Sequence, residues 1–224
     1  MTVRRVAAAA AAALIAVGCA PEAPDYQAVW STTSAPTSAP PTSAAPGAAP
    51  VPIAAYLEQA GVAGQPVAPD RVTDLVVTMP TPPGWKPYQN TNLAPGTRMI
   101  AKGDTYPTAM LMMFELNGDF NVAEALTHAN VDAQMSENFK QLGASTSPFD
   151  GFPSSMIEGS YDLNGARMHS YNRIVIATGA PPKSQRYLIQ FTVTGFADKA
   201  AEQSADIEAI IEGFSVAVPK PPAR

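Results

Sequence analysis

A proline-rich segment, Ser31–Pro52, divides the chain into two parts. It reads STTSAPTSAPPTSAAPGAAPVP and has no charge, no hydrophobic periodicity and almost no large apolar side chain. Because it cannot bury enough apolar surface to offset the entropy of folding, we predict a spacer with Ser and Thr residues open to O-glycosylation. Proline extends such a backbone to about 3.1 Å per residue, or roughly 60–70 Å in total. About 170 residues follow, enough for one ordinary hydrophobic core.

An export signal precedes the spacer. Arg4 and Arg5 lead into the apolar run Val6–Val17, which is shorter than the roughly 20 residues that a membrane-spanning helix needs. Gly18 and then Cys19, the one cysteine of the chain, follow this run. The stretch AVGC resembles the bacterial lipobox. It predicts cleavage between Gly18 and Cys19, a diacylglycerol on the Cys19 thiol and an acyl chain, such as palmitate, on its amino group. Cleavage elsewhere and a retained helix are the alternatives.

The charge balance limits the partners of the chain. The net charge is −5, and loss of residues 1–18 with their two arginines would change it to −7. An acidic chain without a basic cluster is unsuited to nucleic acid and gains nothing from anionic lipid headgroups. Membrane attachment must therefore come from acyl chains, of which two bind stably and one only marginally.

The patterns along the chain predict one α+β domain, an antiparallel sheet flanked by helices. We assign 1–18 to the lipoprotein signal peptide, 19–52 to the lipidated N-terminus and disordered linker, 53–218 to the domain and 219–224 to a frayed tail. Apolar spacings of three and four predict helices over 53–60 and 120–142, and a last helix capped by Asp198. Strands are predicted over 75–79, 98–102, 108–116, 156–163, 167–177 and 187–194.

Local patterns refine this arrangement. Thr108–Leu116 is apolar on both faces, which favours a central strand covered on both sides. Asn164-Gly165 is a strong signal for a hairpin turn. In Tyr187–Thr194 the odd-numbered residues are predicted to face the core, and the even-numbered residues, from Leu188 onward, to face out.

The search for catalytic chemistry gives a negative expectation. The sequence has no motif for a nucleophile elbow, a zinc protease, a phosphate loop or a calcium loop. Ser155, His169 and Asp162 would supply the residue types of a triad, but no spacing supports one. His128 and His169 are better explained as surface or hydrogen-bonded polar residues. We therefore expect no enzyme, no metal and no cofactor.

Two features suggest ligand binding. Five of the seven methionines on predicted strands fit either a lipid-accepting cavity between sheet and helix or an ordinary core, which we favour. The polar stripe, Arg167, His169, Tyr171 and Arg173, alternates onto one face of a strand and would form either a site for a sugar or phosphate headgroup or a solvated face. The methionines are Met110, Met112, Met113, Met156 and Met168.

Several stretches point to a known family: TPPGW at 81–85, MIAKG at 99–103, YPTAMLM at 106–112, GFPSSMI at 151–157, GSYDL at 159–163 and DIEAII at 206–211. With the lipobox, spacer and single domain, they resemble the LpqN/LpqT family of mycobacterial lipoproteins. The resemblance implies a PsbP/Mog1-like fold, a lipidated Cys19 and a place in a mycolate-type cell envelope. It transfers no catalytic residue, because the family has none established.

Two hypotheses for function follow. The resemblance implies links to envelope glycolipids, their transporters and host interaction. Our leading hypothesis is a non-enzymatic module, anchored on the extracytoplasmic face of the cell membrane, that binds an envelope lipid or glycolipid or its transporter. The alternative is a structural or host-facing lipoprotein that binds other proteins and takes no small ligand.

The role of Cys19 can be tested directly. Changing Cys19→Ala removes the thiol that accepts the diacylglycerol, so the chain should leave the membrane fraction or accumulate unprocessed. Fractionation and intact-mass measurement check both outcomes. A variant that stays mature and membrane-bound would contradict the lipid anchor.

Overall fold

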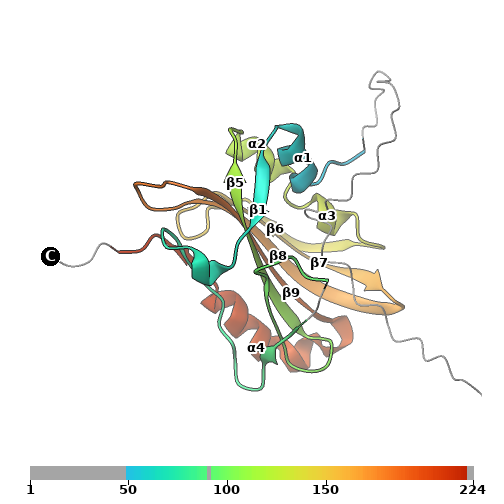
Figure 1. Ribbon diagram of the computed structural model, residues 1–224. Coiled ribbons are helices and arrows are strands. Elements are labelled where there is room, and N and C mark those ends of the chain that lie inside the picture. The colour runs from blue at the N-terminus through green and yellow to red at the C-terminus, as the bar shows by residue number, and fades with distance from the viewer. Residues whose placement is uncertain (1–48, 90–91, 221–224) are drawn as a thin grey trace, which may run out of the picture.

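The structure is a computed structural model that describes residues 49–89 and 92–220 (Figure 1). The signal peptide, Cys19, all but the end of the predicted linker and the last four residues lie outside this range. The helices are α1 (Ile53–Gln59), α2 (Val122–Thr127), α3 (Val131–Gln134) and α4 (Ala200–Gly213), with 3-10 turns η2 (Pro69–Arg71) and η3 (Ala197–Lys199).

The strands of the described residues form two antiparallel sheets. The larger sheet has the order β3-β4-β5-β9-β8-β7-β6, and β1 also pairs with β5; the smaller sheet joins β10 to β2. The strands are β1 (Ala63–Pro66), β2 (Val76–Thr78), β3 (Lys86–Pro87), β4 (Arg98–Ala101), β5 (Thr108–Asn117), β6 (Lys140–Ser145), β7 (Ser154–Leu163), β8 (Ala166–Thr178), β9 (Arg186–Phe196) and β10 (Ser215–Ala217).

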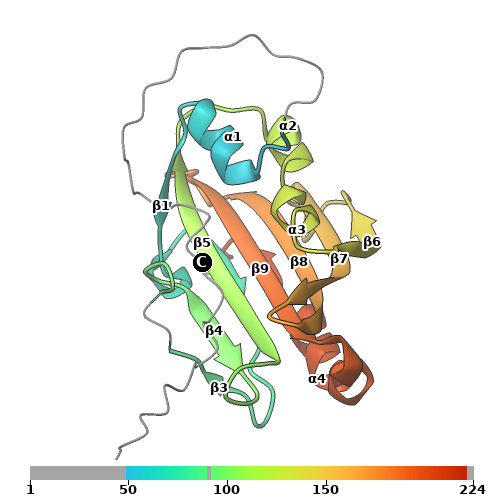
Figure 2. The same ribbon diagram turned by 90° about the vertical axis from the view of Figure 1, so that its right-hand side faces the viewer.

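Hydrophobic cores lie on both faces of the large sheet. One core joins the sheet to α4, β2 and β10 through Leu75, Ile210 and Val216. The other joins the sheet to α1 and α2 through Leu57 and Ala125. Figures 1 and 2 show α1, α2 and α3 on one face and α4 on the other. Both faces of the central strands are therefore removed from water.

Most of the predicted strands are confirmed. β5 is buried on both faces as predicted, and Asn164 and Gly165 take φ angles of 50° and 78° in the turn between β7 and β8. Among the residues predicted to face out, Thr194 is buried, at 4% exposed, and the prediction for Leu188 is also wrong. Its side chain is 0% exposed, because α1 and α2 cover the face of β9 on which it lies.

The single helix predicted over 120–142 is wrong. α2 and α3 are separated by a turn, and the chain then turns at Asn138, with φ 51°, into β6. Met135 and Leu142 had extended the apparent apolar row, yet they are 61% and 64% exposed. Phe139 packs instead against Gly159 of β7, where a Cβ atom would lie 2.4 Å from its ring. Helical spacing matched this segment by coincidence, and the cross-strand contact determines its structure.

The predicted cap of the last helix is also wrong. Asp198 lies inside η3, and Lys199 occupies the N-cap position of α4 without a side-chain hydrogen bond. The extra 3-10 turn moves the start of the α-helix beyond the reach of the Asp198 carboxylate.

A polar contact ties α4 to the segments around Trp85 and Lys102, which lie more than 100 residues earlier in the chain. The indole nitrogen of Trp85 donates to Asp206 Oδ2 at 3.1 Å, and the Lys102 ammonium binds the same oxygen. Trp85 is itself buried in the core beneath α4. The TPPGW turn therefore supplies both an apolar and a hydrogen-bonded support for the helix.

A second contact holds the segment before β2. Asp74 is 6% exposed and accepts a hydrogen bond of 2.7 Å from the Tyr187 hydroxyl of β9. Burial and then this hydrogen bond raise the pKa of Tyr187. The backbone oxygen of Asp74 also accepts from Ala180 N at 2.7 Å. β2 is thus fixed to the large sheet, although it belongs to the smaller sheet with β10.

The Asp206 contact predicts a pH-dependent contribution to stability. The hydrogen bonds from Lys102 and Trp85 hold the pKa of Asp206 below its ordinary value of 3.8. The stabilisation is therefore complete above that value and is lost as the pH falls through the lowered pKa. In urea unfolding, Asp206→Asn should be less stable than the wild type at pH 7, and the difference should shrink between pH 4 and pH 2. The exposed neighbour Glu212→Gln is the matched control, and an equal loss in both variants would contradict the assignment.

Candidate functional site

The polar stripe of β8 lies on the α4 face of the sheet, and its side chains bind one another and β7. Arg167 donates to Asp162 Oδ1 at 2.9 Å, to the Ser160 hydroxyl at 2.7 Å and to the backbone oxygens of Ser160 and Asn138. Its guanidinium therefore has little hydrogen-bonding capacity left for a headgroup. The same bond from Arg167 leads the causes that hold the pKa of Asp162 below its ordinary value.

The other stripe residues are also engaged. His169 Nε2 lies 2.9 Å from Glu158 Oε1. Arg173 donates to the Tyr171 hydroxyl at 2.8 Å, and its guanidinium stacks 4.5 Å from the centre of the Phe149 ring. Phe149 in turn stacks on Phe214 of the core. The stripe is a supporting network of the sheet, and its predicted role with headgroups stays a hypothesis.

The residues of the hypothetical triad are not brought together. The pairings Ser155↔Ile174 and Asp162↔Arg167 place Ser155 on the face of β7 opposite to Asp162. His169 lies on the Asp162 side of the sheet, since it is two residues from Arg167. The His128 ring contacts Val51 O at 2.8 Å and stacks on Tyr56. In residues 49–89 and 92–220 no group of three or more His, Cys, Asp or Glu could hold a metal ion.

Four of the five predicted strand methionines fill the interior of the protein. Met113 belongs to the core beneath α4, and Met110 and Met112 belong to the core beneath α1 and α2. Met168 is 1% exposed. This is the ordinary core that we favoured from the sequence. None of these five methionines lines the cavity described next, although Met99 of β4 does.

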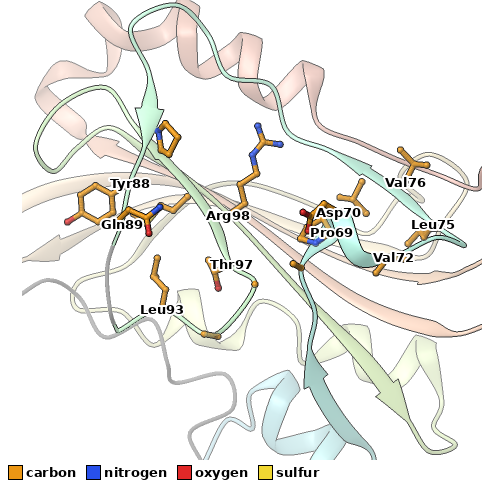
Figure 3. A pocket seen from close by; sticks show the side chains of 16 residues that line it. Pro69, Asp70, Val72, Leu75, Val76, Tyr88, Gln89, Leu93, Thr97 and Arg98 are labelled. Atoms are coloured by element: carbon orange, nitrogen blue, oxygen red, sulfur yellow. The ribbon is translucent and has the colours of Figure 1, made fainter.

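A groove of about 810 Å³ opens at the edge of the large sheet (Figure 3). We call it the edge groove. β1 and β4 pair with the same edge of β5, β1 along Phe114–Asn117 and β4 along Thr108–Leu111. The groove forms where these two strands diverge from that edge. Tyr88, Gln89 and Leu93 lie on one side of the groove, and Val72, Leu75 and Val76 on the other.

The walls of the edge groove belong to the two cores. Val72 and Val77 pack against the core beneath α4, and Tyr88 and Leu93 against the core beneath α1 and α2. The lining is therefore mainly apolar and is held by the body of the domain. Val76, 48% exposed, presents an apolar side chain to solvent within it.

Polar side chains also line the groove, namely Asp70, Gln89, Thr97 and Arg98. Arg98 and Asp70 are its charged lining residues, and no ion pair joins either of them to another residue in the described part of the chain. Arg98 donates to the Thr81 hydroxyl at 3.0 Å. The Thr97 hydroxyl is buried and has no hydrogen-bond partner among the described residues. A groove that combines apolar side chains with Arg98, Asp70 and uncharged polar groups suits an amphipathic ligand better than a fully apolar or a fully polar one.

Close backbone packing shapes one end of the groove. A Cβ atom at Gly96 would lie 2.6 Å from Ala68 N and 2.9 Å from Val67 C. Gly96 also has φ +81°, which side chains other than glycine rarely adopt. The loop before β4 can therefore approach the segment after β1 only because glycine stands at this position.

Comparison with known proteins shows the family of the chain. The family model described as "Probable lipoprotein LpqN" matches residues 49–217. The chain belongs to the LpqN lipoprotein family. A relative from Mycobacterium tuberculosis that carries the name lipoprotein LpqT is 56% identical over 210 residues, or 94% of this chain and 91% of that protein. LpqT of Mycobacterium leprae is 52% identical over 202 residues, or 90% of each chain.

The fold agrees with a solved structure of the family. The crystal structure of LpqN from Mycobacterium tuberculosis aligns with a TM-score of 0.63 at 20% identity, over 75% of this chain and 98% of that one. The predicted LpqN/LpqT resemblance and α+β fold are therefore confirmed. In the part of the chain that the structure describes, no helix is long and apolar enough to cross a membrane.

The sequence did not predict the edge groove. The strands that contribute to its two sides, 75–79 and 98–102, were predicted, but no local pattern indicates that they lie across a groove from each other. The remaining lining comes from η2 and from the segment around Tyr88 and Leu93, where periodicity is absent. The isolated apolar residue Leu93, next to the turn residues Ala94-Pro95-Gly96, was the available signal.

The Gly96 contact predicts a local effect on the groove. Gly96→Ala adds both backbone strain and a clash with the Val67–Ala68 backbone, so the free energy of unfolding should fall by roughly 2–4 kcal/mol. Gly165→Ala is the matched control, because Gly165 has φ +78° but open space around its Cβ position. It should cost about 1 kcal/mol. Hydrogen exchange should rise over 93–99 in the first variant only; equal effects would contradict the role of the contact.

Proposed function

We propose that the protein is a membrane-anchored, non-enzymatic lipoprotein of the cell envelope that binds an envelope lipid or glycolipid, or the transporter that moves one. The observation that carries this proposal is the edge groove, whose volume of about 810 Å³ lies in the range of ligand sites in proteins. The LpqN of similar fold is described as involved in cell envelope biogenesis, which supports the same setting for this chain.

The lining suggests how an amphipathic ligand would lie. An acyl chain would contact Val72, Val76 and Leu93, and this contact would bury its apolar surface away from water. A phosphate or a hydroxyl-rich headgroup would face Arg98, whose planar guanidinium offers several donors. No residue of the groove needs to act as an acid, a base or a nucleophile in this role.

The anchor and spacer would present the groove to the envelope. In this proposal the chain is cut after Gly18, Cys19 carries the acyl chains on the extracytoplasmic face, and residues 19–52 connect the anchor to the domain. At about 3.1 Å per residue in an extended proline-rich chain, this connection reaches roughly 100 Å. The domain could then meet lipids or transporters well away from its own anchor.

Native mass spectrometry of the protein purified from its own envelope tests the proposal. The wild type should retain a bound lipid mass. Val76→Asp places a charge on the wall of the groove, and the affinity for the lipid should fall by about tenfold, since a carboxylate disfavours apolar contact by about 1.4 kcal/mol.

Leu142→Asp is the matched control. Leu142 is another exposed apolar residue, but it lies on β6 at the other end of the large sheet. This variant should keep the lipid. A wild type that is uniformly empty and without a partner, or equal losses in both variants, would contradict the proposal.

A further inference from the structure

A short segment before the spacer differs in composition from its surroundings. Asp25–Trp30, DYQAVW, has two large aromatic residues and one valine, whereas the following residues up to Pro50 are mostly Pro, Ser, Thr, Ala and Gly. No proline occurs between Pro24 and Pro36, so this stretch can take the extended form of a β-strand. We call Asp25–Trp30 the aromatic segment; it lies outside the residues that the structure describes.

We propose that the aromatic segment docks in the edge groove of its own chain and thereby holds the domain close to the membrane anchor. The proposal rests on the existence of the groove and not on its binding of lipid. It is a function of the chain's own residues, separate from any external ligand.

The groove offers a strand edge that suits a polypeptide. Val216 of β10 directs its N–H to Asp150 Oδ2 at 2.9 Å, away from β2. Its cross-strand partner is Val77, so the backbone N–H and C=O of Val77 point away from β10. No strand in the described part of the chain pairs with that side of β2. Val77 lines the groove, and an added strand would satisfy these groups.

Charge and apolar chemistry favour the same occupant. The groove holds two charged residues without an ion pair among the described residues, Arg98 and Asp70, and Asp25 at the start of the aromatic segment is complementary to the first of them. Tyr26, Ala28 and Trp30 would point to one side of a strand, where an apolar groove can bury them. A lipid would fill the groove but would leave the Val77 backbone groups without partners.

The tether is long enough for this contact. The chain between Trp30 and Ala49 spans about 55–60 Å when extended, and a domain of this size is about 40 Å across. A flexible tether of this kind gives the segment an effective concentration in the millimolar range. Even a weak contact would then be occupied for much of the time.

Docking would change the height of the domain above the membrane. The aromatic segment begins six residues after Cys19, a length of about 20 Å, whereas the whole connection to Pro52 reaches about 100 Å. A docked chain keeps the domain beside the membrane, and release extends it outward. A ligand or partner that takes the groove would cause that release.

Disulfide trapping in the mature chain with Cys19→Ser tests the proposal, because this background has no cysteine of its own. The pair Ala28→Cys with Val76→Cys should oxidise at least tenfold faster than the pair Ala28→Cys with Leu142→Cys. Adding Tyr26→Ser and Trp30→Ser should bring the first rate down to the second. Equal unfolding midpoints across the set would show that every variant is folded.

Three outcomes would overturn the proposal. The two pairs would oxidise at equal rates if the segment does not select the groove. The aromatic substitutions would leave the first rate unchanged if proximity alone drives the reaction. In cells, Cys19 is present and acylated. If the Ala28→Cys and Val76→Cys pair then oxidises only at the rate of the control pair, the aromatic residues lie in the membrane interface and not in the groove. None of these results depends on whether a lipid is found in the groove by mass spectrometry.

Discussion

Burial of β5 and β9 on both faces is the constraint that organises this protein. Leu111 and Phe191 lie opposite each other in the two strands and are each 0% exposed. Met112 and Leu188 are buried on the other face. Removing one such side chain from a core typically costs about 2–5 kcal/mol, a large share of a net stability of about 5–15 kcal/mol. The chain must therefore supply a cover for each face, and α1, α2, α4 and the β2–β10 pair are those covers.

The elements that could be predicted from the sequence are those whose signal is local. β5 shows its double burial in nine consecutive residues, and the turn between β7 and β8 shows its geometry in the Asn164-Gly165 pair. The segment 120–142 failed for the opposite reason. The structure of this segment depends on the contact of Phe139, just before β6, with Gly159 of the neighbouring strand β7. The apolar spacing of Met135 and Leu142 carries no information about that contact. The edge groove was missed for the same reason, because its walls come from segments that meet only in the folded chain.

The two ends of the large sheet expose their backbone differently. At one end β6 is interrupted by a register shift between Gln141 and Gly143, which disrupts the regular edge that another chain would need for pairing. At the other end β3 is two residues long and ends in Pro87. These two ends of the sheet are thus protected. Among the described strands, β1 pairs with β5 alone but contributes no residue to the lining of the edge groove, whereas Val76 and Val77 of β2 line it. The edge groove is therefore better suited than β6 to bind a polypeptide by backbone pairing.

The β2–β10 pair joins residues 76–78 to residues 215–217, so the wall of the groove that contains Val76 is completed by the last strand of the chain. Synthesis reaches those residues only when nearly the whole protein has been made. Loops of this length close slowly because their entropy must be overcome before the contact forms. A chain cut short before Ser215 would still contain every strand of the large sheet but would lack support for β2. The wall of the groove that contains Val76 can therefore form only in a chain that extends through Ala217.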